Sequence, residues 1–430
     1  MKSALMKISL LLAISNSFSQ TSPSIEWMDN TRQFLGEKWY GRVKKLSNGD
    51  LALVYNSETF VTSIRFSKDK GKTWSPGSTL IIHPGFESTN AELIELKNGW
   101  LVFGFNDRPL KQDSIFHFAI EVKVSKDKGM TWGNEHLVYQ GGNNWGTGCW
   151  EPAFIQLPSG ELQVYFANET PFVRNNDQEI GMMKSFDNGA TWGQYTRVCY
   201  RMGSRDGMPV PLLAKNGKDI LVSIEDNGAD GSPFKPVIVK TTVQENWSNG
   251  PVVGESRDRW LALDGPSRLS PGDFGAAPYI AQFPSGETVL SFSSTQGRPI
   301  DQNRMKMQVY LGDEQGKNFV AQPAPFDVST DGAGNFNSLG IIDDSTVVAV
   351  SSIFGPVNPG GIWIVMGRLK RSQPVDISIR SRDGRDRSAN SLFYNQVYKN
   401  NIRLFSLESR IYAVDGKQPF PGSSDIGRIK

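Results

Sequence analysis

The chain has 430 residues, including 43 glycines, 24 prolines and 11 tryptophans, and its 46 Lys and Arg residues nearly balance 44 Asp and Glu residues. A chain so close to neutrality offers no electrostatic basis for binding nucleic acid or another polyanion. The glycine, proline and tryptophan content favours a turn-rich β protein, and the length fits either two or three domains or one large domain built from repeats.

Residues 1–20, MKSALMKISLLLAISNSFSQ, place Lys2 and Lys7 ahead of an apolar run from Ile8 to Ile14. This is the pattern of a secretory signal peptide, whose apolar part is too short to cross a bilayer. No later apolar stretch reaches the roughly 18 residues that a membrane-spanning helix requires. We therefore expect a secreted or periplasmic protein without a membrane span.

An octapeptide occurs three times, as SKDKGKTW at 67–74, SKDKGMTW at 125–132 and SFDNGATW at 185–192. Its Asp can accept backbone N–H bonds within a turn, its Gly can adopt the left-handed conformation, and its Trp can bury a large ring between sheets. Each copy therefore predicts a structural fastening of a turn, not a separate active site.

A second signal interleaves with the octapeptides. Asn-Gly or Ser-Gly pairs at 48–49, 98–99, 159–160, 216–217 and 285–286 are each followed by a short apolar strand, and residues 343–352 form a degenerate sixth copy. Such pairs supply the positive φ of a two-residue hairpin turn. A third alternating run follows each hairpin, so the chain contains six copies of one unit of three or four strands.

Such small units cannot bury both faces of their sheets unless neighbours stack on them, and radial closure achieves this. We predict an all-β, six-bladed β-propeller over residues 21–370, with residues 23–40 supplying an outer strand beside the last blade. A row of β-sandwich domains is the competing architecture. Residues 371–430 do not fit the repeat and form a C-terminal extension, either a small β appendage or a cover on the propeller.

The first strand of each blade lines the axis of a propeller, and carboxylates crowd the strand ends of blades two, three and four. Glycoside hydrolysis uses two such groups on either side of the scissile bond. Glu151 starts a strand beside Trp150. Glu225 ends the apolar strand DILVSIE, where packing alone gives no reason for an acid.

The sequence gives no signature of a cofactor or a metal site. His83, His117 and His136 stand in unrelated contexts, so local spacing assembles neither a metal cluster nor a serine-histidine pair. Cys149 and Cys199 either form one disulfide or remain as two buried thiols.

The octapeptide resembles the Asp box of sialidase-like propellers, and this resemblance implies the same six-bladed fold. The segments WEPAFIQLPSGELQVYFANE, SRDGMPVPLL and ILVSIED are similar to the exo-α-1,5-L-arabinanases of glycoside hydrolase family 93, which release arabinobiose with retention of configuration. The resemblance implies that Glu151 and Glu225 are the catalytic pair. The sequence does not decide their roles, and we favour Glu225 as nucleophile and Glu151 as acid/base.

A two-carboxylate mechanism needs no cofactor. We expect an oligo- or polysaccharide as the substrate and a monomer as the oligomeric state. The residues that we expect to contact the sugar are Arg42, Asp107, Trp150, Glu169, Asp206 and Tyr279.

Two alternatives remain open. The first is an exo-sialidase or another glycosidase of the superfamily. A sialidase requires three arginines, a Tyr-Glu pair and an Arg-Ile-Pro segment, whereas this chain has Gly41-Arg42-Val43-Lys44 at the corresponding place. Further candidate arginines are Arg205, Arg257, Arg259, Arg298 and Arg304. The second alternative is a non-catalytic propeller that binds a glycan or a protein.

Overall fold

The computed structural model describes residues 22–36, 38–58, 61–111 and 115–371, together with four short strands between residues 377 and 415. The expected signal peptide, residues 1–20, lies outside the described residues. The chain divides into two compact units, Pro23–Lys370 and a unit that takes in Arg371–Lys430. In the second unit, β26 (Ile377–Arg380) pairs with β27 (Asp386–Ala389), and β28 (Ile402–Leu407) pairs with β29 (Arg410–Asp415).

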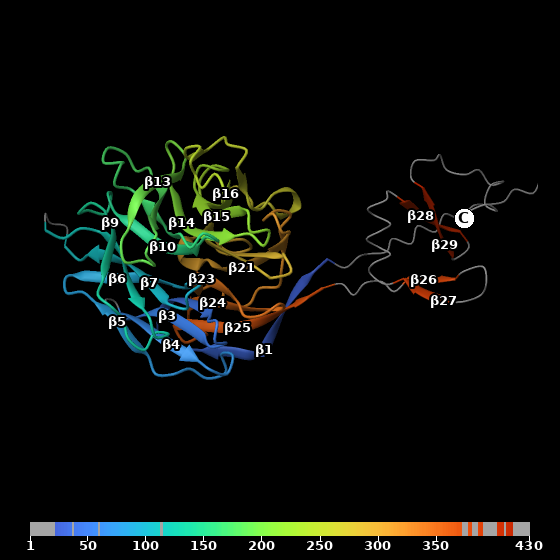
Figure 1. The fold of residues 1–430 in the computed structure, drawn as a ribbon, viewed down its shortest axis with the longest axis horizontal. Coiled ribbons are helices and arrows are strands. Elements are labelled where there is room, and N and C mark those ends of the chain that lie inside the picture. Colours follow the sequence, from blue (N-terminus) through green and yellow to red (C-terminus); the bar gives the residue numbers. More distant parts are fainter. Residues whose placement is uncertain are drawn as a thin grey trace, which may run out of the picture. The chain divides into compact units, whose positions relative to one another are not determined.

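The unit Pro23–Lys370 consists of six sheets, each with four consecutive antiparallel strands, arranged around a common centre, which confirms the predicted six-bladed β-propeller (Figure 1). Blade 1 contains β2 (Trp39–Lys45), β3 (Leu51–Glu58), β4 (Val61–Ser67) and β5 (Ser78–Ile82). Blade 2 contains β6 (Phe86–Glu95), β7 (Leu101–Pro109), β8 (Ala119–Ser125) and β9 (His136–Gln140). Blade 3 contains β10 (Cys149–Gln156), β11 (Leu162–Asn168), β12 (Glu179–Ser185) and β13 (Gly193–Tyr200), with β17 (Val252–Val253) added in parallel.

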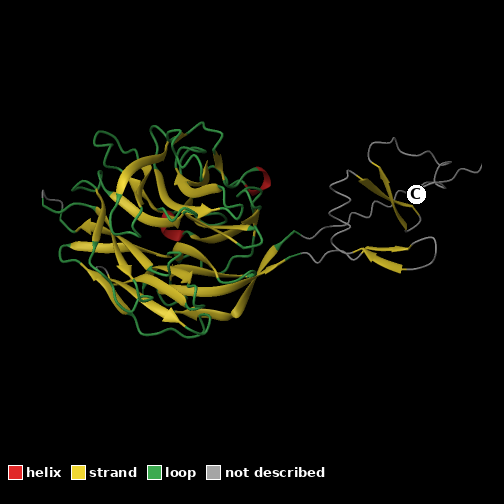
Figure 2. Cartoon of the chain, viewed as in Figure 1, coloured by secondary structure: helices red, strands yellow, loops and turns green. Residues whose placement is uncertain are grey.

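The remaining three blades follow the same order. Blade 4 contains β14 (Asp206–Leu213), β15 (Asp219–Asp226), β16 (Lys235–Thr242) and β18 (Arg259–Leu261). Blade 5 contains β19 (Gly275–Gln282), β20 (Thr288–Ser294), β21 (Lys306–Gly312) and β22 (Val320–Ala321). Blade 6 contains β23 (Ala333–Ile341), β24 (Thr346–Phe354), β25 (Gly361–Lys370) and β1 (Ser24–Phe34). Among the described residues, the helical pieces are the 3-10 turns Gly265–Ser267 and Gln302–Arg304 (Figure 2), neither of which could cross a membrane.

The ring closes through its first strand. β1 runs antiparallel to β25, with partners from Ser24 and Lys370 to Phe34 and Trp363, so the N-terminal segment becomes the outermost strand of the last blade. This confirms the predicted closing role of residues 23–40. The sheet of the last blade is therefore built from both ends of the unit, with β1 covering the outer edge of β25.

The hairpin turns occur where the Gly-containing pairs predicted them, but the predicted loop length of two residues is wrong. In the first blade, Leu46 N–H bonds to the Asp50 carbonyl at 2.8 Å, so three residues lie between the last paired positions. Gly49 has a φ of 92°, whereas the described positive-φ residues do not include Asn48. A three-residue loop of this kind needs one left-handed residue, which explains why glycine stands at its end.

The three octapeptides form the predicted turn fastenings. In the first copy, Thr73 N–H donates to Asp69 Oδ1 at 2.8 Å, Ser67 Oγ donates to the same oxygen, and Gly71 N–H donates to Ser67 Oγ. The same bonds recur around Asp127 and Asp187. Hydrogen bonds from Thr73 lower the pKa of Asp69 to about 2, which keeps the carboxylate ionised.

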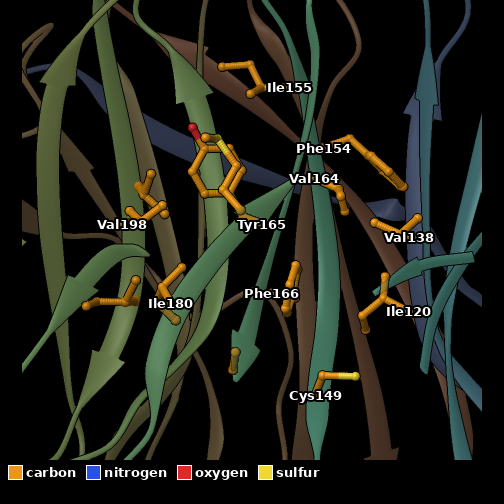
Figure 3. Close-up of a cluster of buried hydrophobic side chains, with 14 of the residues drawn as sticks. Ile120, Val138, Cys149, Phe154, Ile155, Val164, Tyr165, Phe166, Ile180 and Val198 are labelled. Carbon is orange, nitrogen blue, oxygen red and sulfur yellow. The ribbon is translucent and has the colours of Figure 1, made fainter. Parts of the chain in front are cut away.

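The hydrophobic core is divided among the interfaces between neighbouring blades. The largest cluster joins blades 2, 3 and 4 and includes Ile120, Phe166 and Ile180, which are fully buried (Figure 3). Four smaller clusters occupy the other interfaces. Cys149 and Cys199 lie in the large cluster as free buried thiols, so the disulfide is not formed, and burial raises the pKa of both.

Each innermost strand carries a β-bulge at the same place. The register of the first hairpin shifts in all six blades, and each shift encloses one non-glycine residue with a φ between 50° and 58°. These residues are Tyr40, Asn90, Glu151, Met208, Ala277 and Phe336. The left-handed conformation costs a non-glycine residue on the order of 1–3 kcal/mol. A bulge redirects side chains, so six equivalent strained positions mark one end of the axis.

The closing strand should contribute stability through its buried side chain. Ile25 is 2% exposed and packs in the cluster between blades 5 and 6. We expect Ile25→Ala to lower the free energy of unfolding by about 2–5 kcal/mol, measured by urea denaturation and tryptophan fluorescence. Val320→Ala is the matched control, because Val320 lies in the outermost strand of blade 5 but is 53% exposed. Equal losses in the two variants would contradict a closing role for β1.

Candidate active site

A small cavity lies on the axis at the level of the bulges, and side chains from all six innermost strands line it. The lining residues are Tyr40, Arg42, Glu92, Glu151, Pro152, Ala153, Met208, Pro209, Val210, Ala277, Pro278, Tyr279 and Asn337. A larger cavity of about 410 Å³ follows along the axis and shares Glu92 and Tyr279 with the first. The predicted residues Arg42, Glu151 and Tyr279 therefore meet in one place.

Glu151 is the one acidic residue among the six bulge positions. Its side chain is 18% exposed, and Arg108 Nη2 approaches its Oε1 at 3.8 Å. Burial raises the pKa of Glu151 to about 7; Arg108 opposes this rise, and repulsion from Glu225 and Glu169 adds to it. The carboxyl is therefore balanced between its protonated and ionised forms near neutral pH.

Glu225 lies on β15, opposite Gly207 of the neighbouring strand β14. Its Oε2 accepts a hydrogen bond of 2.7 Å from the Ala277 amide of the next blade. Burial raises the pKa of Glu225 to about 7, while the Ala277 N–H and the charge of Arg205 act to lower it. A Cβ on residue 207 would lie 3.0 Å from Glu225 Oε1, so glycine at this position makes room for the carboxyl.

Glu169 and Arg205 form a charged pair beside Glu151. Arg205 Nη2 contacts Glu169 Oε1, and Arg205 Nη1 donates to the Asn176 carbonyl at 3.0 Å. Glu169 is 2% exposed, and its Oε2 is buried without a hydrogen-bond partner among the described residues. An unsatisfied buried acceptor of this kind is costly unless a ligand or water supplies a donor.

Arg42 and Tyr279 belong to a network that crosses the axis. Lys44 Nζ lies 2.9 Å from Glu92 Oε1 and donates to the Tyr279 hydroxyl at 2.7 Å. Arg42 Nε lies 3.7 Å from Glu92, and its guanidinium sits 4.0 Å from the centre of the Tyr40 ring. These contacts hold the side chains of Arg42 and Tyr279 in place where they line the small cavity.

Trp150, a predicted sugar contact, is 8% exposed, and its ring lies in the core. Phe118 and Arg108 cover it, with centroid distances of 4.8 and 5.1 Å. Trp145, in the loop between β9 and β10, stacks on Trp150 at 5.4 Å and is 49% exposed. Of these two stacked rings, Trp145 is the one that offers an exposed aromatic face.

Two further predicted sugar contacts point elsewhere. Asp206 is fully buried and accepts hydrogen bonds from Arg259 on both oxygens, so its acceptors are occupied by the protein. Asp107 bonds to His83 and Ser88 and does not line the small cavity. Both residues flank the site, and their side chains are not available to a sugar in this arrangement.

The sequence argument named Arg205 as a candidate arginine of a sialidase site and assigned no role to Arg108, Gly207 or Trp145. Arg108 and Arg205 stand at strand ends next to predicted acids, so their position on the mouth could have been inferred. Their partners come from other strands and blades, and this information is absent from local sequence.

Comparison with solved structures places the fold among known propellers. The GH93 α-L-arabinofuranosidase of Fusarium graminearum, solved with arabinobiose, has 18% identity and a TM-score of 0.61 over 80% of this chain and 94% of that chain. The α-L-arabinanase of Penicillium chrysogenum, also solved with arabinobiose, has 18% identity and a TM-score of 0.61 over 80% of this chain and 96% of that chain. Trypanosoma rangeli sialidase has 13% identity and a TM-score of 0.51 over 81% of this chain and 58% of that chain.

Comparison of the sequence with curated proteins found no significant match. The family model of the BNR repeat-like domain matches residues 42–324. That segment is more than half of the chain and spans most of the propeller, so the chain belongs to the BNR repeat-like domain family, with a sialidase-like six-bladed fold.

Proposed function

We propose that this protein is a glycoside hydrolase, a retaining exo-acting arabinanase that releases arabinobiose from α-1,5-L-arabinan. The observation that carries the proposal is a pair of partly buried carboxyls, Glu151 at the axial cavity and Glu225 bonded to the Ala277 amide of a strand that lines it, each with a pKa raised to about 7. Glycoside hydrolysis needs one protonated and one ionised carboxyl at the same pH. The arabinobiose complexes of two proteins with this fold support the choice of sugar.

The surroundings of the two carboxyls support Glu225 as nucleophile and Glu151 as acid/base. The Ala277 amide donates to Glu225, and a hydrogen bond to the ionised form favours a carboxylate. Glu151 receives no hydrogen bond among the described residues, and the charges of Glu225 and Glu169 favour its protonated form. In the first step, Glu225 would attack the anomeric carbon while Glu151 protonates the leaving oxygen; Glu151 would then deprotonate the water that releases the sugar.

The exo-sialidase alternative is weaker, because most of its candidate arginines are engaged elsewhere. Arg259 is buried between Asp206 and Asp226. Arg298 donates to four backbone carbonyls, and Arg304 pairs with surface aspartates. Of the arginines predicted for such a role, Arg42 and Arg205 lie near Glu151, but Glu92 holds the first and Glu169 the second.

The proposed activity predicts which product is released and which two variants lose activity. We expect the protein to release arabinobiose from debranched arabinan, detected by product chromatography, and to leave sialyllactose intact. Glu151→Gln and Glu225→Gln should each lower kcat by roughly 10²–10⁴-fold, because each removes a group that acts in the transition state. Asp187→Asn is the control, because it removes a surface carboxylate of the third octapeptide that is not part of the site. Release of neither sugar would refute both substrates, and full activity of either glutamine variant would remove that residue from the mechanism.

The pH dependence of kcat/KM should be a narrow bell around pH 7. Activity needs Glu225 ionised and Glu151 protonated, so the rate falls below the pKa of the first and above the pKa of the second; the two interacting groups titrate as a pair. Replacing Arg108 with Gln removes a cation that lowers the pKa of Glu151. The pKa of Glu151 should then rise, and the alkaline limb should move to higher pH. Movement of the acidic limb would instead assign the nucleophile role to Glu151.

Trp145 should contribute to binding of the polymer. Its half-exposed ring, supported from below by Trp150, offers a flat apolar face to a sugar. Trp145→Ala should raise KM for arabinan by roughly 3–10-fold with little change in kcat, corresponding to about 1 kcal/mol for one aromatic contact. Phe186→Ala, at an exposed position in the third octapeptide, is the control. An unchanged KM in Trp145→Ala, with an unchanged melting temperature, would exclude this contact.

A further inference from the structure

Three potential metal ligands meet on the face of blade 2, outside the central cavity. His83 follows β5 of blade 1, Asp107 lies on β7 and Glu121 lies on β8. Glu121 stands opposite Phe105 in the β7–β8 ladder, and Asp107 is two residues further along, so both carboxylates are on the same face of the sheet. His83 approaches this face from the preceding blade. We call these three residues the blade 2 cluster.

The ligand atoms of the blade 2 cluster are close together. His83 Nδ1 lies 2.5 Å from Asp107 Oδ2 and 3.9 Å from Glu121 Oε2, and all three atoms lie within 4.8 Å of one another. Ser88 Oγ donates to the other oxygen of Asp107 at 2.5 Å and so orients that carboxylate. The cluster thus has ligands from three chain segments, and the Ser88 hydroxyl holds one of its carboxylates in place.

One ligand atom of the cluster has no partner. Glu121 Oε2 is buried and accepts no hydrogen bond among the described residues, although the side chain as a whole is 20% exposed. Burial and the charge of Asp107 raise the pKa of Glu121 to about 7. The neighbouring charges Lys123 and Glu135 pair with each other at 2.9 Å, so Lys123 is not the partner of Glu121. A cation at this point would satisfy the free oxygen and offset the repulsion between the two carboxylates.

We propose that His83, Asp107 and Glu121 bind one divalent transition-metal ion, with Zn²⁺ as the best fit. Zinc ligands at about 2.0–2.2 Å in a tetrahedron lie roughly 3.3–3.6 Å from one another. The His83–Asp107 separation would widen and the His83–Glu121 separation would shorten toward this range when zinc replaces the shared proton. The imidazole favours zinc over Ca²⁺ or Mg²⁺, which prefer oxygen ligands alone.

The site would tie two blades together. Its ligands join the segment after β5 of blade 1 to the second and third strands of blade 2, and the partial exposure of His83 gives the ion an entry path. None of the three residues lines the central cavity. The proposal is therefore independent of the proposed hydrolase activity, and its test needs no substrate.

The test is a zinc titration of the full chain after treatment with a chelator. By calorimetry, the unmodified protein should bind one Zn²⁺ per chain, and zinc should raise its melting temperature, because the ion binds the folded state. Ser88→Ala, which removes the hydrogen-bond partner of Asp107, should weaken zinc binding by roughly 10–100-fold. Glu121→Gln removes a ligand and should weaken binding by more than that. Glu135→Gln, a neighbouring acid outside the cluster, should bind zinc as the unmodified protein does.

The variants must be compared as folded proteins, so their melting temperatures are measured first in the chelator. Co²⁺ in place of zinc gives an absorption spectrum that should change on His83→Gln, which reports ligation by the imidazole. Absence of saturable zinc binding would overturn the proposal. Equal binding by Glu121→Gln and Glu135→Gln, or tighter binding of Ca²⁺ than of Zn²⁺, would overturn it as well.

Discussion

The constraint on which the whole structure depends is that no blade can bury both faces of its own sheet. The core lies at the interfaces between neighbouring blades, so each blade depends on the two beside it. The pairing of β1 with β25 completes the last blade with a strand from the opposite end of the unit. Closure also forces six first strands to meet at one axis, and this convergence creates the cavity.

The same backbone device then serves different ends in different blades. All six first strands have a strained, left-handed residue at the bulge, but the side chains at these positions differ: they are Tyr, Asn, Glu, Met, Ala and Phe. Glu151 alone brings a carboxyl to the ring of bulges, and Ala277 contributes its amide to Glu225. The repeated geometry belongs to the fold, whereas the proposed chemistry depends on the residue chosen at one of six equivalent positions.

The fold could be predicted from the sequence because the strongest sequence signals are local and repeated. The hairpin glycines and the Asp69 turn need nothing beyond a few neighbouring residues, and the structure confirms them. The axial position of Glu151 also followed from its place at a strand start, while its catalytic role stays a prediction. The role of Asp206 could not be predicted in this way, because its hydrogen-bond partner Arg259 lies 53 residues away in the sequence. Alternation fixes the face on which a side chain stands but not what the next segment places against it, so the burial of Trp150 could not be predicted.

Hydrogen bonding separates the buried acids that hold the structure from those that remain available. Asp206 receives donors from Arg259 on both oxygens, so a ligand could add nothing to it. Glu169 and Glu121 each keep one buried oxygen without a partner among the described residues. Arg108 stays 3.8 Å from Glu151, near enough to moderate its charge but too far for a hydrogen bond. A folded chain that leaves such acceptors unsatisfied loses stability at those points, and a bound sugar or metal ion is the partner that would restore it.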